Sequence, residues 1–363
     1  MANNLDAEAL AVRSAYPKNR IMLDDKGLPS VMVFIPKFQL YEVMSGGVVE
    51  THPAFIVNGK EIDGFWIGKY ETKHINGRAY SLPGEAPSYE PGMAEFENYA
   101  EAKGKGWHEV TAAEWAAVAL WCHRHNCEPA GNGYATSDTT RCIGEAVPVS
   151  YISGGAIGRV ATGTGPLIWS HNGKPDGIWD MSGNVYEWGS GIRFVYGELQ
   201  VLENNNAADS RNDKSSSSAN WKAIRGSDGA YITPDGSGTT DGSIKMNWSG
   251  SAVQWNTTVA KGMRSCLFKN ITCSATNIGT AAKRKLVALG LMPDKGLDAT
   301  SGVDDTYGDT QITWNGYDGD VPLLYGGGYK LQYRHIFNTY AMSRNVNSAN
   351  DVGGRVAYVE LPD

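Results

Sequence analysis

The chain has no long apolar run, few cysteines and no excess of basic residues. No stretch of roughly 18 consecutive apolar residues occurs, so the sequence predicts no transmembrane helix. Its N-terminus lacks a basic segment followed by an apolar one, which predicts no secretory signal. Lys and Arg total 32 against 39 Asp and Glu, and the net charge is −7. This balance argues against a general nucleic-acid binder or a protein held on an anionic membrane.

The cysteines show no metal-binding pattern. Cys122 and Cys127 are five positions apart, whereas zinc knuckles space their ligands by roughly two to four residues. The other three have no repeated spacing: Cys142, Cys266 and Cys273. We interpret all of them as buried thiols of a protein folded in a reducing compartment, and we leave a Cys266–Cys273 disulfide open.

Long helical patterns are also scarce, whereas glycine and aromatic residues are abundant. The chain of 363 residues has 44 glycines, 18 tyrosines and 11 tryptophans, and 41% of it is hydrophobic. This combination predicts a loop-rich α+β fold. The length allows one large domain or two ordinary ones, with a core large enough to be stable without disulfides.

The first part of the chain predicts a short helix, a linker and a small antiparallel sheet. Within residues 1–30, Asp6 caps a short helix and Pro17 ends it, and we predict that the remainder is a linker. From residue 31 onward, short apolar runs and the Asn58-Gly59 pair predict strands joined by a hairpin. We therefore place the main domain at residues 31–363.

Three further helices are predicted from the signals at their ends. The first runs along residues 91–104. The second begins at Thr111, because the Thr111 hydroxyl and the Glu114 carboxylate can form a capping box. The third spans residues 280–289, with a glycine directly after it.

Two later stretches differ from the rest. Residues 192–313 are polar and rich in glycine, serine and asparagine, so we predict a large insertion with little regular structure there. Residues 325–352 are rich in Asn, Tyr, Ser, Thr, Asp and Gly, show no regular period, and precede a β-like tail. That composition is typical of a binding surface made of rigid rings and adaptable polar groups. We predict that this segment is held in place rather than free.

The most distinctive short motif is GIWDMSGNVYEWGSG at residues 177–191. Its two tryptophans flank Asp180, Asn184 and Glu187, whose oxygens lie close in sequence to Gly183. Calcium prefers such oxygen ligands. However, Asp and Asn also hydrogen-bond tight turns, and tryptophans fill cores. Spacing alone favours the turn over the calcium site.

Several motifs follow one another in the order of a known family. They resemble F-x-I-x-x-Y-E-V-T, L-P-T-E-A-E-W-E-x-A, G-L-x-D-M-x-G-N-V-x-E-W, R-G-G-S-W and a closing A-x-R … G-F-R, of which the third is the most specific. The matching positions are Phe65–Lys73, Glu109–Ala119, Gly177–Trp188, Tyr325–Tyr329, Met342–Arg344 and Gly353–Arg355. The chain therefore resembles the formylglycine-generating-enzyme branch of the C-type lectin fold. It departs from that pattern where YGGGY lacks the family's Arg and Ser, at Gly354, where Phe is usual, and in an oversized segment between the last two motifs.

The resemblance implies an α+β fold of the C-type lectin type, formylglycine-generating (sulfatase-modifying factor) subtype, over residues 31–363. It also implies a structural calcium ion held by the third motif. The ligand positions carried over from the family are Asp180, Gly183, Val185 and Glu187.

The same resemblance argues against catalysis. The family's oxidases need a cysteine pair, and Leu331 and Ile336 stand at the corresponding positions. Neither side chain can act as a thiolate nucleophile or copper ligand, and no cysteine follows Cys273. The histidine set that sulfoxide synthases use to bind iron is not evident either. We therefore predict that the chain is not an enzyme.

Without those cysteines, the chain resembles a second group on the same fold, the variable proteins of diversity-generating retroelements. This group includes phage receptor-binding proteins akin to the major tropism determinant. Error-prone copying at template adenines scatters Asn codons in their C-terminal segment, which makes that surface hypervariable. The resemblance implies a phage virion protein, made in the host cytoplasm, that binds a protein or glycan on a cell surface and forms homo-oligomers. It implies no nucleic-acid partner and no membrane insertion.

Within the C-terminal segment we separate ligand contacts from scaffold. The predicted contacts are Tyr329, Lys330, Gln332, Tyr333, Arg334, His335, Asn338, Thr339, Tyr340, Ser343, Asn345 and Asn347. The predicted scaffold residues are Gly326, Gly327, Leu331, Phe337, Ala341, Arg344, Val352, Gly353 and Arg355, with the arginines bonding turn carbonyls. The alternative for any one of these tyrosines is a place in the core. The alternative function is that of a lectin-fold adhesin or carbohydrate-binding protein of fixed specificity.

Overall fold

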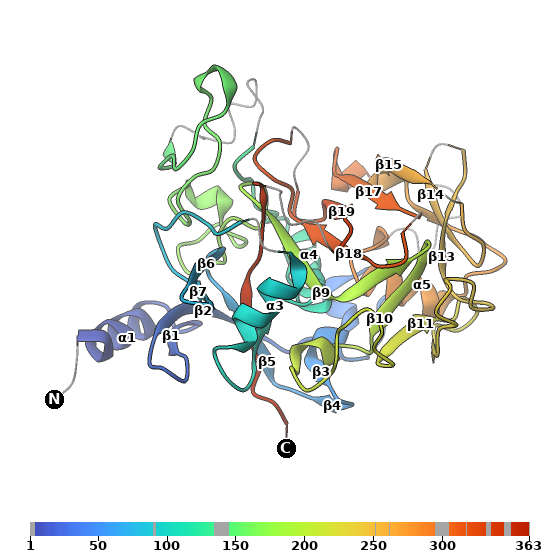
Figure 1. Cartoon of the computed structure of the whole chain (residues 1–363), viewed down its shortest axis with the longest axis horizontal. Helices are drawn as coiled ribbons and strands as arrows, with labels where there is room; N and C mark the ends of the chain where they lie inside the picture. Colours follow the sequence, from blue (N-terminus) through green and yellow to red (C-terminus); the bar gives the residue numbers. More distant parts are fainter. Residues whose placement is uncertain are drawn as a thin grey trace.

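The structure is a computed structural model that describes residues 4–89, 92–133, 145–250, 252–260, 262–294, 305–316, 318–331, 335–344 and 350–362. It is a mixed α+β molecule built mostly of sheets and loops, as the sequence predicts (Figure 1). Its α-helices are α1 (Asn4–Ala15), α2 (Leu40–Val43), α3 (Met93–Glu101), α4 (Ala112–Arg124) and α5 (Thr280–Ala288). Within these ranges, no helix is long and apolar enough to cross a membrane.

The central helix α4 begins where the predicted capping box places it. The Thr111 hydroxyl accepts a hydrogen bond from the Glu114 amide at 3.1 Å, and the Glu114 carboxylate accepts one from the Thr111 amide at 3.0 Å. Two amides at the start of the helix are thereby satisfied. The helix then packs against α2, α5 and β9 (Tyr186–Val195), so its start helps to position the core.

The first sheet has five strands and includes the last strand of the chain. In spatial order they are β1 (Asn19–Leu23), β2 (Pro29–Pro36), β5 (Gly64–Gly68), β21 (Val356–Tyr358) and β8 (Trp107–Glu109). The predicted linker is therefore wrong for residues 19–30. Because β1 is an edge strand that buries little besides Asn19, its sequence lacks the apolar alternation that would have predicted it. The helix α1 projects away from the body (Figure 1).

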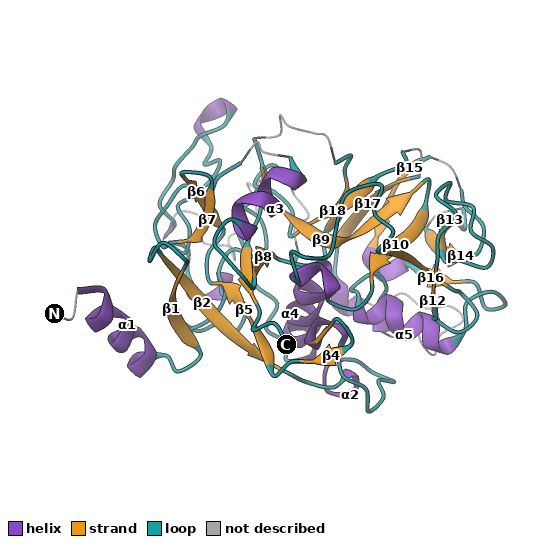
Figure 2. Ribbon diagram, turned by 60° about the horizontal axis from the view of Figure 1, so that its bottom comes forward, coloured by secondary structure: helices purple, strands orange, loops and turns teal. Residues whose placement is uncertain are grey.

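The second sheet has twelve strands and lies on the other side of α4 from the first (Figure 2). Along its main path the order is β15 (Met263–Leu267), β17 (Gln311–Asn315), β19 (Thr339–Ala341), β18 (Val321–Tyr325), β9, β10 (Glu198–Leu202), β13 (Lys245–Trp248), β14 (Val253–Asn256) and β16 (Thr272–Cys273). Off this path lie β11 (Trp221–Ile224), β12 (Tyr231–Ile232) and β20 (Val352–Gly353).

Two small hairpins complete the described strands. One joins β3 (Ile56–Val57) to β4 (Lys60–Glu61), and the other joins β6 (Thr72–Ile75) to β7 (Arg78–Ser81). The first turns at the predicted Asn58-Gly59 pair, whose φ angles are +50° and +74°. A two-residue turn with both φ angles positive matches the twist of the strands it joins, so this hairpin prediction is confirmed.

The prediction of little regular structure in residues 192–313 is wrong. This stretch supplies α5 and most strands of the second sheet. Several of its buried strand positions are polar and satisfy one another. Arg193 donates to the Gln200 side chain at 2.8 Å through Nη2, and Gln200 donates to the Glu198 carboxylate at 2.8 Å. A strand that buries paired polar groups does not show apolar alternation, which is why the pattern did not reveal it.

Strand β9 is the centre of the second sheet, and all of its residues are buried. Gly189 on this strand leaves room for the ring of Tyr325 on β18, because a Cβ atom there would lie 2.2 Å from the ring. The Tyr325 ring in turn stacks on Trp115 of α4, with 5.5 Å between ring centroids. A larger residue at position 189 would therefore displace Tyr325 and disturb the contact between the sheet and α4.

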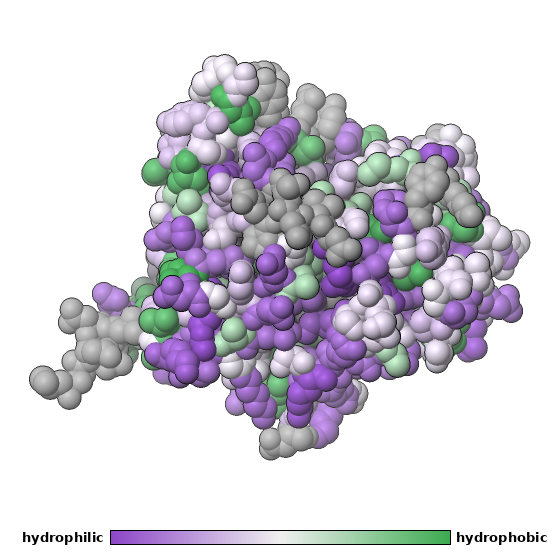
Figure 3. Space-filling view, in the orientation of Figure 1, coloured by the Kyte–Doolittle hydropathy of each residue, from purple (hydrophilic) through white to green (hydrophobic). Residues whose placement is uncertain are grey.

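Exposed apolar side chains gather in the segment of residues 145–170. They are Val147, Val149, Tyr151, Leu167 and Ile168. Hydrophilic residues cover much of the face drawn in Figure 3, with hydrophobic atoms at the upper left, where this segment projects. The C-terminal segment predicted to bind a ligand is thus distinct from the apolar projection.

His74 on β6 makes the stability of the fold dependent on pH. Its ring lies 4.5 Å from those of Phe96 and Tyr99, and burial lowers its pKa from 6.5 to about 4. As the pH falls through this window, the unfolded chain binds a proton before the native one does. We expect the free energy of unfolding to fall by about 2–3 kcal/mol from this group between pH 6.5 and 4.

Urea titrations of the wild type and of His74→Phe at several pH values measure that difference. Phenylalanine keeps the ring packing but cannot titrate, so the variant should lose this part of the pH dependence. His125→Phe is the matched control, since His125 is exposed. Equal pH dependence in the wild type and His74→Phe would contradict the prediction.

Candidate functional site

The C-terminal segment Tyr325–Val352 begins and ends beside one residue of β9. Tyr325 on β18 is the antiparallel partner of Glu187, and Gly353 on β20 is its parallel partner on the other side. In the middle of the segment, β19 pairs with β18 and β17. The segment, drawn in red in Figure 1, is therefore anchored at both ends and at its centre, as the sequence predicts.

Four predicted contact residues have accessible side chains. Lys330 is exposed, and His335, Tyr340 and Ser343 are half-buried. The ammonium group of Lys330 lies 3.4 Å from the carboxylate of Asp351. Successive residues of a strand face opposite sides of the sheet, and on β19 only the central residue, Tyr340, is accessible. These four side chains could meet a ligand without rearrangement of the core.

Three other predicted contacts are buried, so the expectation of an exposed side chain is wrong for them. Tyr329 is 4% exposed, and Asn338 and Thr339 are each 2% exposed. The Tyr329 amide donates to the carbonyl of Asn184 at 2.9 Å, and the Asn338 carbonyl accepts from Gly326 at 3.1 Å. Composition could not separate a polar side chain used in the scaffold from one that faces solvent. Five further predicted contacts lie outside the described residues: Gln332, Tyr333, Arg334, Asn345 and Asn347.

The predicted scaffold residues hold the segment against the body. Gly326 has a φ of +80°, and a Cβ atom there would lie 2.8 Å from the Met181 carbonyl oxygen. Arg344 donates to the Asp320 carboxylate at 2.7 Å and lies 3.6 Å from that of Glu97. Glycine is needed at the first position because only it fits that backbone and that space. The arginine fixes the outer part of the segment by charge.

His335 links the segment to the end of α4. Its Nε2 lies 3.9 Å from the Glu128 carboxylate, which also contacts His123 at 2.5 Å. Its ring stacks on Phe337, with 5.8 Å between ring centroids. Burial raises the pKa of Glu128, but the hydrogen bond from His123 and the charges of both histidines outweigh it, and the net shift is downward. A negative carboxylate is therefore favoured between these two rings.

The motif at residues 177–191 folds as tight turns joined to the C-terminal segment. Asp180 and Asn184 have φ angles of +64° and +62°. The Asn184 side chain donates to Glu71 at 2.6 Å and accepts from the Val160 amide at 2.9 Å. The Gly183 amide donates to the carbonyl of Gly326 at 2.9 Å. These bonds agree with the turn interpretation of the motif.

Arg355 is the fully buried cation at the centre of this region. Its guanidinium donates to both oxygens of Glu187, at 2.6 and 2.7 Å. Its other donors reach the carbonyls of Gly68 and Trp179, each at 2.9 Å. Arg355 therefore bonds backbone carbonyls as predicted, but they belong to the end of β5 and to a β-bridge rather than to turns. For Arg344 the prediction of carbonyl partners is wrong, because its guanidinium pairs with carboxylates. A two-point ion pair of this kind fixes orientation as well as charge, so Arg355 joins both sheets to the 177–191 motif.

Three further acidic residues surround this pair, and burial raises the pKa of each carboxyl group. Burial raises the pKa of Glu71 and of Glu109 well above the ordinary value. Burial also raises the pKa of Asp180 to about 6. Removing charge from a buried acid avoids its desolvation cost. Glu187 is the carboxylate paired with Arg355, through hydrogen bonds to both of its oxygens.

Only part of the predicted calcium set fits a calcium ion. Glu187 does not, because both of its oxygens accept hydrogen bonds from Arg355. Asp180 fits better, since its Oδ1 is buried without a hydrogen-bond partner while Oδ2 accepts from Gly163 at 2.8 Å. Across the part of the chain that the structure describes, no group of three or more His, Cys, Asp or Glu could hold a metal ion. Calcium at Gly183 and Val185 stays a prediction.

The positions of the family's catalytic cysteines are occupied by packed apolar side chains. Ile336 is fully buried, and Leu331 packs against the cluster that contains Trp188. The described cysteines are free thiols: Cys122, Cys127, Cys266 and Cys273. The disulfide left open between the last two is thus not formed here. Cys142 lies outside the described residues.

Sequence reasoning missed two acids of the Arg355 cluster, Glu71 and Glu109. Both lie inside motifs used for the resemblance, but neither was considered as a partner of Arg355. The available signal was an acid near the end of each strand that flanks β21: Glu109 is the last residue of β8, and Glu71 lies three residues after β5. Neighbouring strands bring such positions together, and a sequence does not reveal which strands are neighbours.

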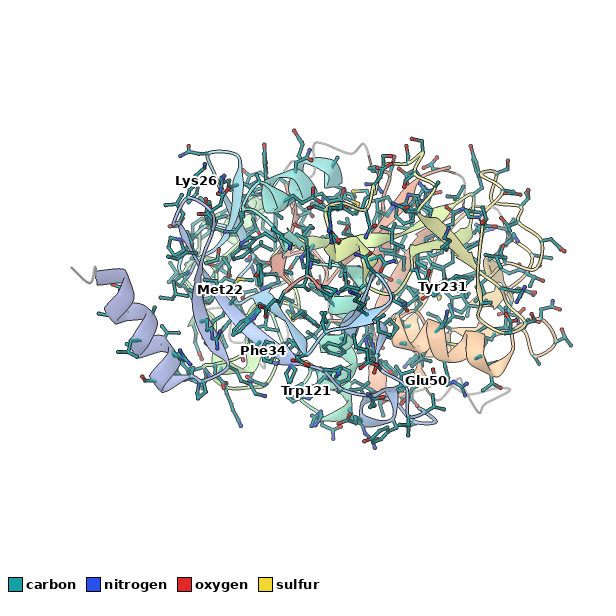
Figure 4. All side chains as sticks on the ribbon, turned by 90° about the horizontal axis from the view of Figure 1, so that it is seen from below. Met22, Lys26, Phe34, Glu50, Trp121 and Tyr231 are labelled. Carbon is teal, nitrogen blue, oxygen red and sulfur yellow. The ribbon has the colours of Figure 1, made fainter. Side chains whose placement is uncertain are left out.

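Two hollows lie away from the C-terminal segment. A cavity of about 80 Å³ between β2 and α4 is lined by Phe34 and Trp121, which lie close together in Figure 4. A larger cleft of about 690 Å³ runs along α5 and includes Glu50 and Lys285. The Lys285 ammonium lies 3.4 Å from the ring centroid of Tyr231. None of the described residues of Tyr325–Val352 lines either hollow, so this part of the predicted binding surface is separate from both.

Comparison with known proteins finds a structural likeness but no family. No family model matches the chain, and no curated protein matches it. Among solved structures, the chain is similar to the structure of PvdO from Pseudomonas aeruginosa, with 14% sequence identity and a TM-score of 0.36. The match covers 91% of this chain and 94% of that one. At this identity and score, the likeness does not assign a function.

Proposed function

We propose that this protein is a non-enzymatic ligand-binding protein on a C-type lectin scaffold of the formylglycine-generating-enzyme subtype. The observation that carries the proposal is the anchoring of Tyr325–Val352 on both sides of β9. Main-chain pairing holds this segment in place whatever its outward side chains are, while Lys330 and Tyr340 remain accessible. Such an arrangement separates the part that must stay constant from the part that can vary.

We further propose that a retroelement diversifies this segment and that the protein belongs to a phage virion. The abundance of Asn, Tyr and Ser in the segment supports this, because miscopied adenines convert Asn codons into codons for Tyr and Ser. Sequencing the DNA around the gene tests it. A reverse-transcriptase gene beside an imperfect repeat of the segment, differing at adenines, is the expected result. Without these, the protein would be a lectin-fold adhesin of fixed specificity.

The accessible residues provide a direct test of binding. We expect the combined variant Lys330→Ala, Tyr340→Ala and Ser343→Ala to lose binding to cells while its free energy of unfolding changes by about 1 kcal/mol or less, as for most surface substitutions. Flow cytometry of fluorescently labelled protein on a panel of intact bacterial strains measures binding. Urea denaturation measures stability.

A matched control uses the same residue types elsewhere on the surface. Lys60, Tyr41 and Ser45 are exposed and lie on or next to β4 and α2. Their combined alanine variant should bind cells as the wild type does. If both variants bind equally well, the accessible side chains of the segment are not the contact surface.

The packing at the positions of the family's cysteines supports a binding role over an oxidase role. Ile336 is buried in the main core, and Leu331 packs against the cluster that contains Trp188. Neither position therefore offers a reactive group. Oxygen consumption by the copper-loaded protein with a thiol-containing peptide would instead support an oxidase function. We expect none above a copper-only blank.

A further inference from the structure

The C-terminal end of α4 brings two cysteines together. The helix ends at Arg124, and Asn126 beyond it has a φ of +51°. The Cys127 amide donates to the Cys122 carbonyl at 3.0 Å, and the Asn126 amide donates to the His123 carbonyl at 3.2 Å. This pair of bonds defines a Schellman motif, in which the side chains of the residues at the two ends of the longer bond meet. Here both of those residues are cysteines.

The two thiols differ in exposure and in hydrogen bonding. Cys122 is fully buried, and its sulfur donates to the His171 carbonyl at 3.2 Å. Cys127 is half-buried, and its sulfur donates to the Cys122 carbonyl at 3.6 Å. A small reagent can therefore reach Cys127 from solvent, whereas Cys122 is accessible only from Cys127.

The acidities of the two groups agree with this difference. The neighbouring Cys122 side chain lowers the pKa of Cys127, and burial opposes this only in part. Burial raises the pKa of Cys122 well above its ordinary value. Because the thiolate is the nucleophile in exchange reactions, Cys127 is the better attacking group.

We propose that Cys122 and Cys127 form a thiol–disulfide exchange site whose substrate is a small external disulfide. The Cys127 thiolate attacks one sulfur of the external disulfide, forms a mixed disulfide and releases one thiolate. Cys122 then loses its proton and attacks the Cys127 sulfur, which releases the second thiolate. The protein gains a Cys122–Cys127 disulfide, and the external disulfide is reduced to two thiols.

This site goes beyond the proposed function and does not rest on it. It lies next to the proposed binding segment, because Glu128 follows Cys127 and contacts His335 at 3.9 Å. Disulfides need a narrow range of backbone separations, and the backbone bonds of this motif hold both cysteines at a fixed separation. The other described cysteines lack this arrangement. Cys273, for example, directs its thiol to the Met292 sulfur at 3.1 Å.

The test is oxidation of the full-length protein by glutathione disulfide under native conditions, followed by non-reducing proteolysis and mass spectrometry. We expect loss of two hydrogen atoms and a peptide crosslink between Cys122 and Cys127. Cys122→Ser should instead accumulate a glutathione adduct on Cys127, whereas Cys127→Ser should react at least tenfold more slowly at Cys122. Cys142→Ser should behave as the wild type, which separates this pair from a crosslink through Cys142.

Near-ultraviolet circular dichroism shows whether each variant is folded, and alanine variants at both positions serve as substitutes. A Ser variant that is misfolded is replaced by its Ala counterpart, which removes the thiol without adding a polar group to the core. A crosslink to any other cysteine would overturn the proposal. So would an unmodified Cys122–Cys127 pair in the folded wild type after prolonged oxidation.

Discussion

Replacing Arg355 by methionine is expected to lower the free energy of unfolding by about 3–5 kcal/mol, because it leaves a buried carboxylate without its partner. The guanidinium is fully buried and donates to both oxygens of Glu187. It also satisfies the carbonyls of Gly68 and Trp179, which would then lose a donor. Equilibrium unfolding in urea at neutral pH measures the loss.

The surface offers a control with the same two-point geometry. Arg225 donates to both oxygens of Asp228, at 2.9 and 2.6 Å, and both side chains are exposed. Arg225→Met should cost far less than Arg355→Met, because exposed ion pairs contribute little to stability. Adding Glu187→Gln to Arg355→Met should restore part of the loss, because the buried charge is gone. Equal stability of Arg355→Met and the wild type would show that the buried pair does not hold the sheets together.

Replacing Trp188 by alanine is expected to cost about 3–5 kcal/mol, the usual range for a large aromatic truncated in a core. Trp188 is fully buried on β9, within a cluster that includes Met93, Phe96 and Leu324. Leu324 lies opposite it on β18, one residue before the C-terminal segment begins. The cavity should therefore also loosen that segment, which amide hydrogen exchange of β18 would report.

Two further variants separate the cavity from the loss of an indole. Trp188→Phe leaves a smaller void and should cost less than the alanine variant. Trp66→Ala removes a half-buried tryptophan from the first sheet and should leave hydrogen exchange in β18 unchanged. If Trp188→Ala and the wild type have the same urea midpoint of unfolding, this cluster contributes little to stability.

Local features of the fold were predictable because short-range chemistry decides them. The capping box at Thr111 and Glu114 and the turn at Asn58-Gly59 use residues that are neighbours in sequence. The position of the C-terminal segment between strands could also be predicted, since glycines and a β-like tail bracket it. For the cap and the turn, the interacting groups lie within a few residues of one another.

The exposure of individual side chains was not predictable in the same way. Tyr329 and Asn338 have the composition of a contact surface but are buried in the scaffold. Residues 192–313 looked unstructured because their strands bury polar pairs such as Glu198 and Gln200. Both errors have one cause, which is that partners distant in sequence determine whether a polar group is satisfied inside the protein or in water.

The sequence alone determined the α+β class and the caps and turns, whereas the segment that contacts a ligand stays a prediction. The tertiary structure alone decided that Arg355 pairs with Glu187 and which carboxyl groups crowd around them. It also decided that Cys122 and Cys127 differ in access to solvent. Turns and caps depend on bonds between near neighbours, whereas burial and charge pairing depend on which distant segments the sheets bring together.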